Sequence, residues 1–127
     1  MREITKTLSV PVDGKPMDFR LKKLDAFSGV SLLRMMANLP ENASVADLFS
    51  RLSDTDLRSL MVTCLQHAEV LLPAGWMPVM TRGEWTYPEL EHDTAVCLRL
   101  TIEEIAWTLE GFFSAGASAF RTGTPAS

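Results

Sequence analysis

The stretch TLSVPVDGKPMDFRLK, residues 7–22, decides how the fold begins. Apolar and polar residues alternate on both sides of Asp13-Gly14, as they do in strands that bury one face. Asp-Gly favours a two-residue hairpin turn, because both turn positions of that hairpin need a positive φ angle. The sequence therefore predicts a hairpin over residues 3–23, and a shift of one residue would split its apolar face. The predicted pairs are Val12 with Lys15, Pro11 with Pro16, Val10 with Met17 and Leu8 with Phe19.

Apolar residues at helical spacing follow the hairpin and predict helices over 26–39, 45–52, 54–72 and 102–116. Residues 89–100 are ambiguous between helix and strand and favour a short helix. The expected caps are residues whose side chains accept hydrogen bonds from backbone N–H groups at a helix start. They are Asp25 or Ser28, Asn42 or Ser44, Ser53, and a capping box over 101–104.

These elements predict a mainly α fold, with the N-terminal β-hairpin packed on a small bundle of about four to five helices. The 127 residues suit one domain, expected over residues 1–116. Residues 117–127 are small, polar and contain Gly and Pro, which predicts a flexible C-terminal tail.

Composition narrows the class of function. The net charge of −4 argues against phosphate-backbone binding as the main activity and predicts no nucleic-acid partner. The first ten residues contain no apolar segment typical of a signal peptide, and no apolar run is long enough for a membrane span. We therefore expect a cytoplasmic protein. Cys64 and Cys97 have no metal-ligand spacing, and each is expected to be a small buried hydrophobic residue.

The sequence lacks a convincing catalytic constellation. His67 is expected on the flank of a helix, and His92 lies in an acidic run, Glu89–Asp93, that is more typical of a solvated surface than of a metal site. Neither cysteine has a base nearby in sequence, and the glycines do not form a phosphate-binding loop. The prediction is a protein that is not an enzyme and that uses no cofactor and no metal.

Apolar residues outside the expected packed faces are candidates for partner binding. In helix 26–39 the face with Val30, Leu33 and Met36 is expected to point inward, which leaves Met35 outward beside Arg34. In the last helix Trp107 is expected opposite Leu109, beside Glu103. The loop 73–88 is rich in aromatic residues and is expected either to be packed or to bind a partner. Trp and Met are favoured at interfaces, although a second layer of chain could also cover these residues. The candidate partner-binding residues are Met35, Arg34, Val62, Trp76, Met80, Trp85 and Trp107.

A family resemblance rests on FRLKKLDAFSGVSLLRMM, residues 19–36. Its strand residues Phe19 to Lys22 with Leu24, and its helix residues Ala26, Gly29, Leu32 and Leu33, resemble the tail assembly chaperones of lambda-like phages with long non-contractile tails, and of their prophages. The resemblance implies a chaperone that binds the tape measure protein during tail assembly. A longer form, made by programmed frameshifting, would recruit tail tube subunits, and the protein would be absent from the mature virion.

A small adaptor or regulatory protein of a phage or bacterial system is the alternative interpretation. The sequence leaves the oligomeric state open, and self-association remains one of the possibilities.

Overall fold

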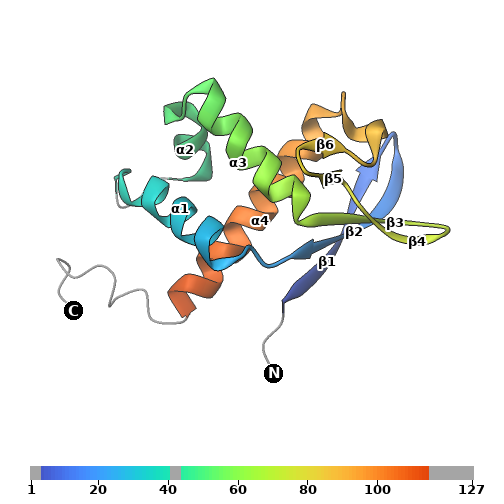
Figure 1. Ribbon diagram of the computed structural model, residues 1–127, viewed down its shortest axis with the longest axis horizontal. Helices are drawn as coiled ribbons and strands as arrows, with labels where there is room; N and C mark the ends of the chain where they lie inside the picture. The colour runs from blue at the N-terminus through green and yellow to red at the C-terminus, as the bar shows by residue number, and fades with distance from the viewer. Residues whose placement is uncertain (1–3, 41–43, 115–127) are drawn as a thin grey trace.

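The computed structural model of the protein describes residues 4–40 and 44–114, the last four by their backbone alone (Figure 1). Its strands are β1 (Thr5–Val12), β2 (Lys15–Lys22), β3 (Ala68–Leu72), β4 (Gly75–Pro78), β5 (Met80–Thr81) and β6 (Glu84–Trp85). Its helices are α1 (Ala26–Ala37), α2 (Val45–Arg51), α3 (Asp54–Gln66), a short 3₁₀ helix η1 (Pro88–Leu90) and α4 (Thr94–Ser114). The expected tail, 117–127, lies outside the described residues.

The predicted hairpin is confirmed in turn and register. Asp13 and Gly14 have φ angles of 52° and 79°, the positive values that the two-residue turn requires. Val10 pairs with Met17, and Leu8 pairs with Phe19. The inward face is buried because the alternation of the sequence matches the pleat of the strands.

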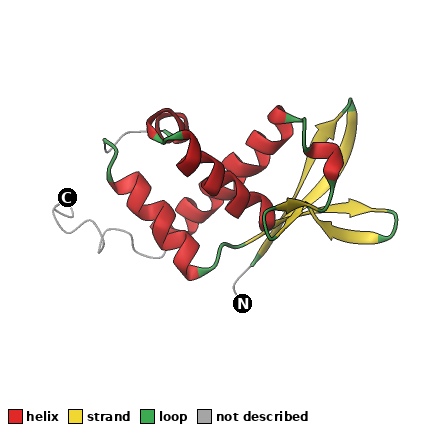
Figure 2. Cartoon of the chain, turned by 45° about the horizontal axis from the view of Figure 1, so that its top comes forward, coloured by secondary structure: helices red, strands yellow, loops and turns green. Residues whose placement is uncertain are grey.

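The prediction of a mainly α fold is wrong. About half of the residues are helical, at 50%, but 28% are in strands, so the chain has an α/β fold. The strands form a four-stranded antiparallel sheet in the order β1-β2-β3-β4 and a small β5–β6 hairpin. Figure 2 shows the helices gathered towards one end of the molecule and the strands towards the other.

The helix expected over 54–72 ends early, at Gln66, and its last part becomes strand β3. Helix α3 begins as predicted, with the Ser53 hydroxyl accepting from the backbone N–H of Asp56. Residues 68–72 then pair with β2, where Val70 lies opposite Phe19. An apolar run of this kind suits either a helix or a buried strand, and the free edge of β2 decides in favour of the strand.

The segment expected as a loop, 73–88, contains the strands β4, β5 and β6. Of the two expectations for this segment, packing or partner binding, packing is confirmed: Val79 and Met80 are buried. The carbonyl of Val79 accepts hydrogen bonds from the N–H groups of Thr86 and Tyr87, which closes the base of the β5–β6 hairpin. The N–H of Val79 donates to the carbonyl of Ala68 on β3, which joins the hairpin to the sheet.

Helix α4 is one continuous helix rather than a short helix followed by a second one starting at 102. Its first turn is capped by Asp93, whose carboxylate accepts from the N–H of Val96 at 3.1 Å. The expected capping box over 101–104 is therefore wrong. Thr101 lies inside the helix, where its hydroxyl donates to the carbonyl of Cys97. A capping-box pattern does not start a helix when the preceding residues are already helical, because the backbone N–H groups that it would cap are bonded within the helix.

Two apolar clusters hold the fold. The first joins the sheet to α3, to the β5–β6 hairpin and to the start of α4, and includes Phe19, Leu21 and Val70. The second lies among the four α-helices. Its buried members are Leu32, Leu48, Leu60, Cys64 and Ile105.

The inward faces of α1 and α4 differ from the prediction. In α1 Leu32 is the buried residue, Met35 is partly buried, and Val30 is 54% exposed. In α4 the apolar residues lie on several sides, because the helix packs against both clusters. Trp107 is consequently half-buried against the first cluster, whereas Ile102 is 39% exposed.

Candidate functional site

A groove runs between helix α3 and the β5–β6 hairpin and ends at the start of α4, with a volume of about 350 Å³. Its α3 wall consists of residues at helical spacing, three or four apart, so they share one side of the helix. The opposite wall comes from the hairpin and from residues 91–97. The α3 residues are Asp54, Leu57, Arg58, Met61, Val62 and Leu65; the others are Met80, Gly83, Trp85, Glu91, Thr94 and Cys97.

The hairpin wall is fixed by its turn and by one side chain of α3. Arg82 and Gly83 have φ angles of 53° and 78°, which gives the tight turn. The N–H of Gly83 donates to Oε1 of Gln66 at 2.6 Å, and this hydrogen bond ties the turn to the end of α3. The hydroxyls of Thr81 and Thr86 hydrogen bond to each other at 2.7 Å across the base of the hairpin.

The groove is apolar inside and charged at its mouth. Leu65, Met80 and Cys97 form a buried floor. Asp54, Arg58 and Glu91 also line the groove but are exposed, and they take part in none of the ion pairs among the described residues. An apolar interior with a few polar groups at the edge is the usual composition of a binding site.

Three of the seven residues predicted to bind a partner meet in this groove: Val62, Met80 and Trp85. Sequence reasoning assigned Leu57, Met61 and Leu65 to the core, because they belong to the regular apolar stripe of α3. The apolar stripe of α3 in fact packs against the core along one side and lines the groove along the other. With Val62 the apolar stripe is wider than one packed face requires, and this excess width is the signal in the sequence that could have revealed the groove.

The other four predicted residues lie elsewhere. Arg34 is exposed on α1, and Met35 packs against the second cluster. Trp76 lies on β4, where the guanidinium of Arg20 stacks at 4.4 Å from its ring centroid. Trp107 packs on the first cluster, with the ammonium of Lys23 at 5.4 Å from its ring. These residues do not form a common surface with the groove.

Two basic residues of β2 share an internal partner. Arg20 and Lys22 point away from the apolar face, as expected, and both contact the carboxylate of Glu69 on β3, at 2.7 Å and 3.4 Å. Glu69 is only 9% exposed, so this cross-strand cluster compensates a nearly buried charge. Its role is to support the sheet.

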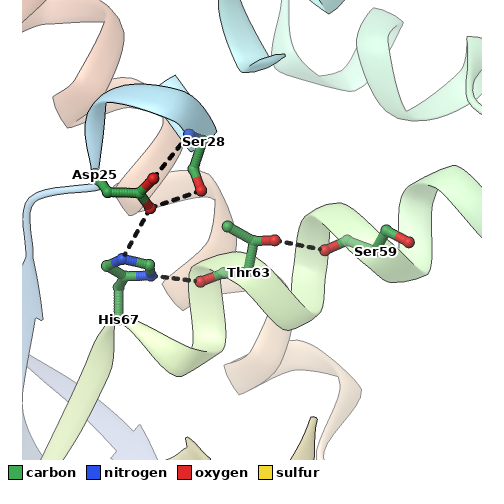
Figure 3. Close-up of polar contacts among 5 residues, drawn as sticks. All are labelled: Asp25, Ser28, Ser59, Thr63 and His67. Atoms are coloured by element: carbon green, nitrogen blue, oxygen red, sulfur yellow. Dashed lines mark hydrogen bonds and ion pairs between the residues drawn. The ribbon is translucent and has the colours of Figure 1, made fainter. Parts of the chain in front are cut away.

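Residues of the types found in hydrolase triads meet where α1 begins beside the end of α3 (Figure 3). The hydroxyl of Ser28 donates to Oδ1 of Asp25 at 2.7 Å, and Nε2 of His67 lies 3.7 Å from the same oxygen. Nδ1 of His67 donates to the carbonyl of Thr63 at 2.7 Å. In a triad the histidine contacts the serine, whereas here the carboxylate stands between them. This arrangement cannot activate Ser28 as a nucleophile.

Asp25 instead acts as the N-cap of α1. Its carboxylate accepts from both the hydroxyl and the backbone N–H of Ser28, and these hydrogen bonds lower the pKa of Asp25. The contact with His67 joins the start of α1 to the end of α3. The network therefore has a structural explanation.

Glu104 is an unusual titratable residue. It is completely buried, and neither carboxylate oxygen has a hydrogen-bond partner within the described part of the chain. Burial raises its pKa to about 8. The hydroxyl of Thr108, one turn further along α4, is also buried without a partner there. Burial, and secondarily the charge of Glu104, raise the pKa of the Cys64 thiol on α3.

Both cysteines are buried, as predicted, and both are free. Within residues 4–40 and 44–114, no three His, Cys, Asp or Glu side chains are grouped so that they could hold a metal ion. Within the same ranges, no helix combines the length and the apolar character needed to cross a membrane.

Comparisons with protein-family models, with curated proteins and with solved structures found no match to this chain.

Proposed function

We propose that this protein is a non-enzymatic assembly chaperone that binds an apolar helical segment of another protein in the α3/β5–β6 groove. The observation that carries the proposal is the groove itself, where Val62, Met80 and Trp85 line an apolar hollow with an exposed, charged mouth. An amphipathic helix laid into an apolar groove is a recurring mode of recognition. The thioethers of Met61 and Met80 suit such a role, because methionine adapts its shape to different partners.

The resemblance of residues 19–36 gives the proposal its biological setting. In that setting the partner is the tape measure protein of a lambda-like phage, bound in the host cytoplasm before the tail tube polymerises. A frameshift-extended form would bring tail tube subunits, and the chaperone would leave before the virion matures. A slippery sequence near the end of the gene, with an overlapping frame and a long helical reading frame downstream, would support this setting.

Co-purification with a fragment of the tape measure protein from the same phage or prophage tests the proposal. Val62→Asp places a charge in the groove and should abolish the complex. Ile102→Asp, on the exposed side of α4, is the matched control, because it makes the same kind of change on a helix outside the groove, and it should leave binding unchanged.

Circular dichroism of both variants separates loss of binding from loss of fold. Wild-type chain that fails to retain the fragment, or folded Val62→Asp chain that binds as well as wild type, would overturn the assignment of the groove.

A further inference from the structure

Helix α1 carries an exposed apolar face. Phe27 is 87% exposed and Val30 is 54% exposed. With Arg34 they occupy positions i, i+3 and i+7, which lie along one side of a helix. Arg34 is exposed and takes part in none of the ion pairs among the described residues. We refer to Phe27, Val30 and Arg34 as the α1 face. Exposed apolar groups on a rigid helix are typical of an interaction surface.

The α1 face and the groove are far apart in one molecule. In Figure 1, α1 lies towards one side of the molecule and the β5–β6 hairpin towards the other, with α3 and α4 between them. A helix and a groove that are placed in this way cannot meet within one chain. They can meet between two chains.

The α1 face is short enough to fit into the groove. From Asp54 to Leu65 the α3 wall of the groove is about 17 Å long, at 1.5 Å per residue, and from Phe27 to Arg34 the α1 face covers about 10 Å. The groove volume of about 350 Å³ is roughly twice that of an apolar cavity of about 150 Å³ that holds benzene. It therefore has room for the phenyl ring of Phe27 and the isopropyl group of Val30.

The charges of the α1 face and of the groove mouth are complementary. The mouth of the groove has two exposed acidic residues, Asp54 and Glu91, and one basic residue, Arg58. The α1 face ends in the basic Arg34. Opposite charges at the edge of an apolar contact favour association and fix its orientation.

We propose that the protein associates with itself head to tail, with Phe27 and Val30 of one copy inserted into the groove of the next and Arg34 beside the acidic mouth. In a complex of two copies, one copy keeps a free groove and the other keeps a free α1 face, so the contact extends into chains or closes into rings. One helix in one groove buries less area than a standard interface, so the association is transient. The inference goes beyond the proposed function but shares its groove, so a partner helix competes with α1.

Sedimentation velocity between about 10 μM and about 1 mM, a range that covers transient interfaces, tests the proposal. The average mass of the wild-type chain should rise with concentration. Phe27→Asp and Val62→Asp, each studied alone, should remain at the monomer mass of 14.1 kDa. Aspartate at position 27 lies in the first turn of α1, where the helix dipole favours it, so the fold is preserved.

Mixing the two variants gives the sharpest result. Phe27→Asp keeps an intact groove and Val62→Asp keeps an intact α1 face, so an equal mixture should form complexes of two chains and nothing larger. Ile102→Asp should associate as the wild type does. Wild-type chain that stays monomeric over the whole range, or folded variants that fail to pair when mixed, would overturn the proposal.

A surface charge change covers the case in which Val62→Asp does not fold. Glu91 is exposed, so Glu91→Lys leaves the packing intact, and it should weaken self-association by roughly threefold to fivefold. Unchanged self-association of Glu91→Lys would contradict the proposed docking. Wild-type chain that binds the tape measure fragment but never self-associates would refute this inference alone and leave the proposed function standing.

Discussion

Replacing Glu104 by glutamine should stabilise the protein, and the gain should depend on pH. Glu104 is fully buried on α4, and its carboxylate oxygens have no hydrogen-bond partner among the described residues. An ionised carboxylate in such a place is costly, which is why burial raises the pKa of Glu104 from 4.5 to about 8. Glutamine has nearly the same shape and cannot ionise.

The size and sign of the effect follow from proton linkage. Between pH 4.5 and about pH 8 the folded chain keeps the proton on Glu104, whereas the unfolded chain has released it. The free energy of unfolding therefore falls as the pH rises through this window, by about 1.4 kcal/mol per pH unit, and levels off above it. At pH 7 the loss amounts to about 3 kcal/mol, which Glu104→Gln avoids.

Urea unfolding of both chains from about pH 4 to about pH 9 measures this difference. The two stabilities should be similar near pH 4 and should diverge as the pH rises, with the variant more stable. Glu103→Gln is the matched control, because the Glu103 carboxylate is partly exposed and contacts Arg99 and Lys6, so its removal should bring no such gain. A stability difference that is the same at every pH would refute the reasoning.

Three further predictions concern the sheet, a helix and the thiols. Gly14→Ala should cost about 1 kcal/mol of unfolding free energy, because its φ is +79°, whereas Gly29→Ala should gain about 0.5–1 kcal/mol, because this helical position has open space for a Cβ. Equal effects in urea unfolding would contradict this reading. Glu69→Gln should destabilise the chain by about 2 kcal/mol in the same assay, because it weakens a nearly buried charge cluster, and an unchanged midpoint would show that the cluster does not stabilise the sheet. Of the two thiols, that of Cys64 should react with a disulfide reagent only when the chain opens, since it is buried in the second cluster and burial raises its pKa; rapid labelling of Cys64 in the folded protein would contradict this.

The groove shows why a binding site is harder to predict than a core. The sequence indicated that Val62, Met80 and Trp85 are unusual apolar residues, but they come from three different elements. Only the placement of the β5–β6 hairpin beside α3, tied by Gln66 to Gly83, brings them together. Met35 and Trp107 looked equally unusual in sequence, and tertiary packing partly buries both of them.

The sequence by itself determined the features that depend on neighbouring residues. The Asp13-Gly14 turn and the alternation around it determined the first hairpin and its register, and side chains at 25, 44 and 53 determined where three helices begin. These features need only a turn geometry or a local hydrogen bond, so the local sequence is sufficient.

Tertiary structure decided the features that depend on distant contacts. Residues 68–72 have an apolar pattern that suits helix and strand equally. They become strand β3 because the free edge of β2 is available for pairing, and the paired residues are far apart in sequence, 49 positions in the case of Arg20 and Glu69. The same pairing extends the predicted hairpin into a sheet, and this is why the fold is α/β rather than mainly α. Helix α4 is apolar on several sides, so only its packing between the two clusters could decide that Glu104 points inward and Ile102 outward.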